Sequence, residues 1–79
     1  MVYVDSAKIH YGRMIMSHMV ADTHAELVEM AEKIGVAAKW IQHEGTPREH
    51  FDVCLSARGK AVKFGAKEIT GKELVRMKQ

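Results

Sequence analysis

The chain has 79 residues, 47% of them hydrophobic and 28% charged, which is typical of one small globular domain (residues 1–79) and excludes a disordered chain. Its single cysteine excludes an internal disulfide and a multi-cysteine zinc site, and no apolar run reaches the roughly 18 residues of a membrane helix, so we expect a cytoplasmic protein with no membrane partner. The net charge is +2, but residues 58–79 form a basic third, which is a candidate surface for nucleic acid or an acidic protein.

Two short apolar runs near the N-terminus predict strands. Residues 2–4 (VYV) are rich in β-branched and aromatic side chains, and residues 17–21 (SHMVA) form a second run that ends at Asp22. Residues 6–16 between them receive no assignment, although Gly12 indicates a turn.

A capping box marks the first helix. The Thr23 hydroxyl can accept a hydrogen bond from a free backbone N–H at the helix start, and the Glu26 carboxylate can reach back. Apolar residues then follow at spacings of three and four, and Gly35 supplies the left-handed conformation that ends many helices. The pattern predicts a helix over residues 23–34.

The middle of the chain predicts a strand and a loop. Residues 36–42 (VAAKWIQ) alternate in polarity as a strand does, with Trp40 on one face. Gly45 and Pro47 mark the loop that follows. We expect residues 50–54 (HFDVC) to be a brief extended piece or the entry to a helix.

Two further helices and a strand complete the chain. The second helix is predicted by apolar residues at helical spacing, which also assigns the cysteine to the core: Cys54, Ala57, Ala61 and Phe64. It ends at Gly65, and residues 66–69 (AKEI) follow as a last short strand. A second Thr-x-x-Glu capping box predicts a terminal helix over residues 70–78, with Leu74 and Met77 facing inward.

This order of elements predicts an α/β fold. Strands that alternate with about three helices indicate a single domain with a short, mainly parallel sheet of three to four strands. A sheet this small leaves its edges and much apolar area uncovered, so we expect a homodimer or a larger oligomer.

Polar side chains gather at the predicted strand ends and helix starts, where an open α/β sheet binds its ligands. His50 and Asp52 are two residues apart and share one face of an extended segment, while Phe51 faces the core. His18 and Asp22 are four apart and share a face in either a strand or a helix. The candidate site consists of six residues: Asp5, Arg13, His18, Asp22, His50 and Asp52.

Three interpretations of this set are open. A divalent zinc, manganese or iron ion suits two imidazoles and two carboxylates, in this case His18, Asp22, His50 and Asp52. Alternatively, the His–carboxylate pairs act as general acid–base groups while an arginine, Arg13 or Arg48, holds a phosphate or a carboxylate. In the third interpretation the aspartates only cap helices and the histidines hydrogen-bond to the backbone. The other histidines, His10, His24 and His43, are left outside the set.

Several stretches carry a family resemblance: GRMIMSHMVAD, ELVEMAEKIGV, HFDV and GAKEIT. Over nearly its whole length the chain resembles a small bacterial and phage domain of unknown function, family 4031. The family pattern is G-R, H-[LM]-V-x-D, a helix, H-[FY]-D and a G-A before the last strand, and six residues match it: Gly12, Arg13, His18, Asp22, His50 and Asp52. The resemblance implies that these polar residues belong to one site, and it brings no activity with it.

We therefore expect a small cytoplasmic domain whose His/Asp/Arg pocket binds a phosphorylated small molecule such as a nucleotide. A phage accessory or anti-defence protein could use such a pocket to sequester a host signalling nucleotide. Two alternatives are a phosphoesterase or nuclease that uses the same residues with a divalent metal cofactor, and a nucleic-acid- or protein-binding module that acts through the basic C-terminal third.

Overall fold

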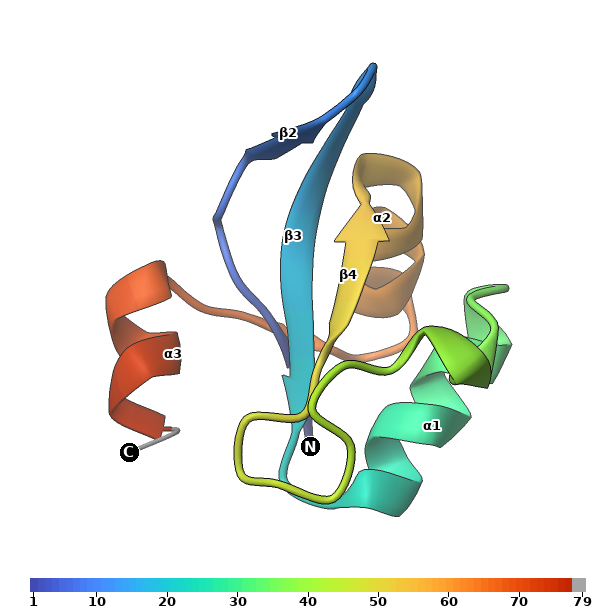
Figure 1. Ribbon diagram of the computed structural model, residues 1–79, viewed down its shortest axis with the longest axis vertical. Helices are drawn as coiled ribbons and strands as arrows, with labels where there is room; N and C mark the ends of the chain where they lie inside the picture. Colours follow the sequence, from blue (N-terminus) through green and yellow to red (C-terminus); the bar gives the residue numbers. More distant parts are fainter. Residues whose placement is uncertain (78–79) are drawn as a thin grey trace.

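A long β-hairpin forms the middle of the fold in the computed structural model, which describes residues 1–77 (Figure 1). β3 (Met14–Ala21) is the longest strand. Both β1 (Val2–Val4) and β2 (Ile9–Tyr11) pair antiparallel with one edge of β3. The turn between β2 and β3 contains Gly12 at φ 60°, a conformation that glycine adopts without steric strain.

A bulge separates β1 from β2. The register of the hairpin passes from the pair Val4–Met19 to the pair Ile9–Met16, so residues 5–8 lie opposite only two residues of β3. The extra residues cannot all join the ladder, and their polar groups need other partners. Bulges of this kind are common beside functional sites.

The complete sheet has five strands and is mixed. β4 (Phe51–Cys54) pairs antiparallel with the second edge of β3, and β5 (Lys67–Glu68) pairs parallel with β1. The α/β class and the three helices are confirmed, but the prediction of a mainly parallel sheet of three to four strands is wrong. The reason is local: residues 6–16, which received no assignment, contain β2 and the start of β3, and a hairpin produces an antiparallel pair.

Two helices cover one face of the sheet and enclose the core. α1 (His24–Lys33) and α2 (Leu55–Lys63) lie on the same side of β3 and β4 (Figure 1). The most deeply buried large side chains of this layer include Met19 of β3, Leu27 of α1 and Phe51 of β4, whereas α2 contributes the small Ala57 and Ala61. Burial of an apolar side chain of this size stabilises the fold by about 1.5–3 kcal/mol.

The ends of α1 agree with the prediction from its capping residues. The Thr23 hydroxyl accepts a hydrogen bond from the backbone N–H of Glu26 at 3.2 Å, and it donates to the Glu26 carboxylate at 2.9 Å. The Glu26 carboxylate therefore reaches back to the N-cap residue Thr23, as the capping box predicts. Gly35 follows the helix at φ 81°.

α2 begins with Cys54 as its N-cap, so this residue lies at the edge of the core and is half-buried. The Ser56 hydroxyl at 3.2 Å and then the backbone N–H of Ala57 lower the pKa of the Cys54 thiol. Ala57 and Ala61 are buried as predicted, whereas Phe64 is exposed at the C-cap.

α3 (Gly71–Met77) stands on the other side of the sheet from α1 and α2 (Figure 1). Its capping box is reciprocal, with the Thr70 N–H donating to the Glu73 carboxylate and the Glu73 N–H to the Thr70 hydroxyl, both at 3.1 Å. Leu74 is half-buried, but Met77 is 40% exposed, so the predicted inward orientation is wrong for Met77. Position 78, the last of the predicted helix, lies outside the described residues.

Residues 36–42 do not form the predicted strand. They contain the 3-10 turn η1 (Ala38–Trp40), and of this segment only Gln42 makes a β-bridge, with His50. Trp40 is exposed, and the Lys39 ammonium lies 5.2 Å from the centroid of its ring. The indole therefore has a cation beside it and no packed strand, so the alternation in residues 36–42 does not reflect a buried face.

Within residues 1–77 no helix has both the length and the apolar character needed to cross a membrane.

Candidate functional site

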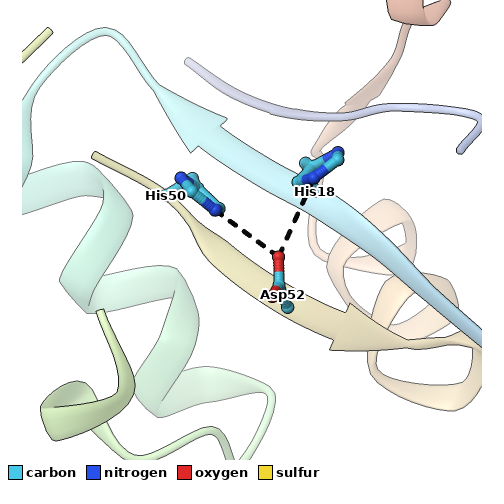
Figure 2. Close-up of side chains that lie close together, drawn as sticks. All are labelled: His18, His50 and Asp52. Atoms are coloured by element: carbon cyan, nitrogen blue, oxygen red, sulfur yellow. Dashed lines mark ion pairs between the residues drawn. The ribbon is translucent and has the colours of Figure 1, made fainter. Parts of the chain in front are cut away.

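The face of the sheet opposite α1 and α2 carries a polar cluster. β3 and β4 are in a register that places His18 directly opposite Asp52. His50 comes two residues before Asp52 and therefore lies on the same face, while Phe51 and Val53 are buried on the other. Figure 2 shows the side chains of His18, His50 and Asp52 converging from the two strands.

Asp52 lies between the two imidazoles. Its Oδ1 is 3.5 Å from Nε2 of His50 and 3.9 Å from Nε2 of His18 (Figure 2). One ligand atom from each of the three residues lies within 4.8 Å of the other two. Two atoms that bind one metal ion at about 2.1 Å with a tetrahedral angle are about 3.4 Å apart, so the 3.5 Å distance fits a single divalent ion directly and the 3.9 Å distance requires a small movement of a side chain.

Asp5 fixes the orientation of His18. Its carboxylate is only 2% exposed and fills the bulge of the hairpin. One oxygen accepts from Nδ1 of His18 at 2.7 Å, and the other accepts from the backbone N–H groups of His18 and Ala7 at 2.8 and 3.2 Å. Because an ionised carboxylate can only accept, Nδ1 of His18 is the donor in this bond, and in the neutral imidazole Nε2 then presents its lone pair toward Asp52.

Hydrogen bonds also hold the atoms of His50 and Asp52 that point away from the centre of the cluster. His50 donates from Nδ1 to the Arg48 carbonyl at 2.9 Å, so in the neutral imidazole Nε2 is the nitrogen with the lone pair, and it faces Asp52. The Gln42 amide donates to Oδ2 of Asp52 at 2.7 Å. Metal-binding histidines in proteins are usually held by a carboxylate or a backbone carbonyl on the ring nitrogen that does not bind the metal.

A cavity of about 350 Å³ opens beside this cluster and extends toward α3. Its polar end is formed by His18, His43, Arg48 and His50. Its apolar side is formed by Val20, Leu74 and Val75. The volume lies at the lower end of the range of small-molecule sites in proteins.

The structure brings Asp5, His18, His50 and Asp52 together, but it separates two other predicted residues from them. Asp22 is exposed at the end of β3, where it accepts from the Tyr3 hydroxyl at 3.3 Å and lies 3.5 Å from the N-terminal ammonium. Arg13 is exposed in the turn of the hairpin. In the part of the chain that the structure describes, neither side chain makes a hydrogen bond or an ion pair with the cluster.

The position of the cluster also differs from the prediction. We expected the site beyond the strand ends, as in a parallel sheet. Because β3 and β4 are antiparallel, their carboxyl ends lie at opposite ends of the sheet. The residues meet instead on the open face of the sheet, in the register pair His18–Asp52.

Sequence reasoning missed Gln42, and it left His43 outside the set. His43 has φ 54°, a left-handed conformation that few residues other than glycine adopt. Its ring stacks on that of His50 with centroids 5.8 Å apart. The spacing of residues along the chain does not predict which strand face a loop residue will contact. The only sequence signal for His43 is its position between Gln42 and the turn at Gly45.

Residues 2–79 match the model of a family described as a protein of unknown function (DUF4031), which confirms the resemblance drawn from the sequence. Searches of curated proteins and of solved structures each found no match.

Proposed function

We propose that this chain, which belongs to the DUF4031 family of proteins of unknown function, binds a divalent metal ion and, through it, a phosphorylated small molecule. The protein ligands of the ion are His18, His50 and Asp52. A set of two imidazoles and one carboxylate suits zinc, iron or manganese.

One observation carries the proposal: three electron-pair donors face one another. In the neutral imidazoles the hydrogen bonds on Nδ1 leave Nε2 of both His18 and His50 with a lone pair, and these atoms lie 3.9 and 3.5 Å, respectively, from the Asp52 carboxylate oxygen. Such an arrangement is repulsive unless a metal ion lies between the donors or a proton occupies Nε2, and distances of 3.5 and 3.9 Å are longer than an N–H···O hydrogen bond. The hydrogen bonds to Nδ1 of His18, Nδ1 of His50 and Oδ2 of Asp52 support a site whose side chains are already ordered before the ion binds.

Arg48 supports the phosphate part of the proposal. Its side chain lines the same cavity, and within residues 1–77 its guanidinium has no ion-pair partner, in contrast to Arg58, which is 2.9 Å from Glu68. A guanidinium binds phosphate oxygens in a bidentate manner. A bound divalent ion would supply a Lewis acid that neutralises phosphate charge.

Hydrolysis of a phosphate ester is the second candidate function. Its support is the number of protein ligands, because three ligands leave a coordination position open, as in catalytic metal sites. Release of inorganic phosphate from a generic aryl phosphate, measured with and without added Zn²⁺ or Mn²⁺, separates this function from binding alone.

The test of metal binding is calorimetric titration of the untagged chain with Zn²⁺ and Mn²⁺. We expect one ion per chain and a loss of affinity on the order of 100-fold or more in His50→Ala and Asp52→Asn. His10→Ala, which removes an exposed histidine of β2, is the matched control and should bind as wild type does.

Melting temperatures of the metal-free variants complete this test. A loss of binding without a loss of stability indicates a functional site, since such sites often trade stability for chemistry. Unstable variants that bind the ion with unchanged affinity would instead assign the histidines a structural role and refute the proposal.

A further inference from the structure

We infer that the phosphorylated ligand is a mononucleotide, whose base lies between the His43 ring and the apolar side of α3. This inference rests on the proposed function, because the metal and Arg48 would hold the phosphate.

The inner side of α3 is only partly covered by protein. No residue of α3 is buried, although the helix is well formed at its reciprocal capping box. Leu74 and Val75 line the cavity, and Val75 is 61% exposed. Apolar surface of this kind gains about 25 cal/mol for each Å² that a ligand removes from water.

His43 offers a ring surface to the same cavity. One face of its imidazole lies against His50, with an angle of 28° between the ring planes. Within residues 1–77 its side chain has no hydrogen-bond or ion-pair partner. The left-handed backbone at φ 54° is unfavourable for a histidine, and residues held in such conformations cluster at binding sites.

These features select a ligand with an anionic group at one end and a planar ring at the other. The phosphate end meets Arg48 and the His18–His50–Asp52 cluster, and the ring packs between an imidazole and aliphatic side chains, both of which bind nucleobases in proteins. The cavity of about 350 Å³ is near the lower limit for small-molecule sites, which favours one nucleotide over a dinucleotide or a strand.

The test compares four probes by calorimetry on the Zn²⁺- or Mn²⁺-loaded full chain: inorganic phosphate, ribose 5-phosphate, adenosine 5′-monophosphate and uridine 5′-monophosphate. We expect at least one nucleotide to bind on the order of tenfold or more tightly than ribose 5-phosphate, because only the nucleotides carry a ring. Val75→Asp should remove this preference and leave the metal affinity unchanged. Met77→Asp, a change on the same helix at a residue that does not line the cavity, is the control and should keep the preference.

Equal affinities for ribose 5-phosphate and both nucleotides, with metal and phosphate binding intact, would overturn the inference and leave the proposed function standing. A chain that binds neither metal nor phosphate would overturn both. Tighter binding of a single strand than of a mononucleotide, with a steep dependence on salt, would also overturn the inference, since it would assign the surface to nucleic acid.

Discussion

Substitution of Asp5 separates two roles of one buried carboxylate. In Asp5→Asn the remaining oxygen can still accept the backbone N–H groups of His18 and Ala7, but an NH₂ group faces Nδ1 of His18. Because an amide nitrogen only donates, His18 must move its proton to Nε2, the nitrogen that faces Asp52. In Asp5→Ala the two backbone N–H groups lose their acceptor as well.

The expected magnitudes differ for the two variants. A buried N–H without an acceptor costs about 1–3 kcal/mol, so Asp5→Ala should lower the free energy of unfolding by about 2–6 kcal/mol. For a chain of 79 residues the total free energy of unfolding is about 4–12 kcal/mol. The melting temperature of Asp5→Ala should therefore fall by roughly 8 °C or more. Asp5→Asn keeps the oxygen that accepts both backbone N–H groups and should lose only about 1–2 kcal/mol.

Thermal melts in a chelator measure the stability of the metal-free variants, and titration with Zn²⁺ measures the site. Asp5→Asn should weaken Zn²⁺ binding by about 10–100-fold because the wrong nitrogen carries the proton. Asp22→Asn, which changes an exposed carboxylate outside the cluster, is the control and should bind Zn²⁺ as wild type does. Unchanged Zn²⁺ affinity in Asp5→Asn would refute the role of Asp5 in orienting His18. A melting temperature of Asp5→Ala within about 2 °C of wild type would refute its role in stability.

Two further predictions concern stability and assembly. The hydrogen bond from His24 to Glu49, the Glu49 charge and then the Glu44 charge raise the pKa of His24 above its ordinary value of 6.5. The His24–Glu49 pair therefore stabilises the fold fully below pH 6.5 and loses this contribution as the pH rises through the raised pKa of His24. The melting temperature of wild type should fall in this pH window relative to that of His24→Gln. Melting temperatures of the two proteins that change in parallel with pH would contradict this prediction. Among the described residues β2 pairs only with β3, and its Ile9 and Tyr11 are 44% and 75% exposed. We therefore expect self-association along the outer edge of β2, which Ile9→Lys should weaken. Sedimentation of wild type as a monomer at all concentrations would exclude this.

The sequence predicted those parts of the fold that depend on neighbouring residues. The Thr-x-x-Glu boxes and Gly35 located α1 and α3, and the period of two in the segment HFD placed His50 and Asp52 on one face and Phe51 in the core. These features act within one turn or one strand, so their residue types suffice to reveal them.

Contacts between distant segments could not be read in the same way. Asp5 meets His18 only because residues 5–8 bulge from the hairpin, and nothing in the local pattern fixes that register. Asp22 shares the required spacing with His18, yet Tyr3 and the chain start lie beside it instead. Spacing along the chain defines which side chains share a face, but the pairing of strands decides which faces meet.

The adjacency of β3 and β4 would give a bound metal a second effect, on the lifetime of the protein. The two strands are paired in space, but α1, η1 and the loop with His43 separate them along the chain. An ion held by His18 and Asp52 would therefore close this long segment as a reversible cross-link present only in the folded state. At a free concentration 100 times its dissociation constant it would add about 2.7 kcal/mol to the unfolding free energy. Depletion of the metal would raise the unfolded fraction that proteases degrade, so the amount of protein would follow the metal supply.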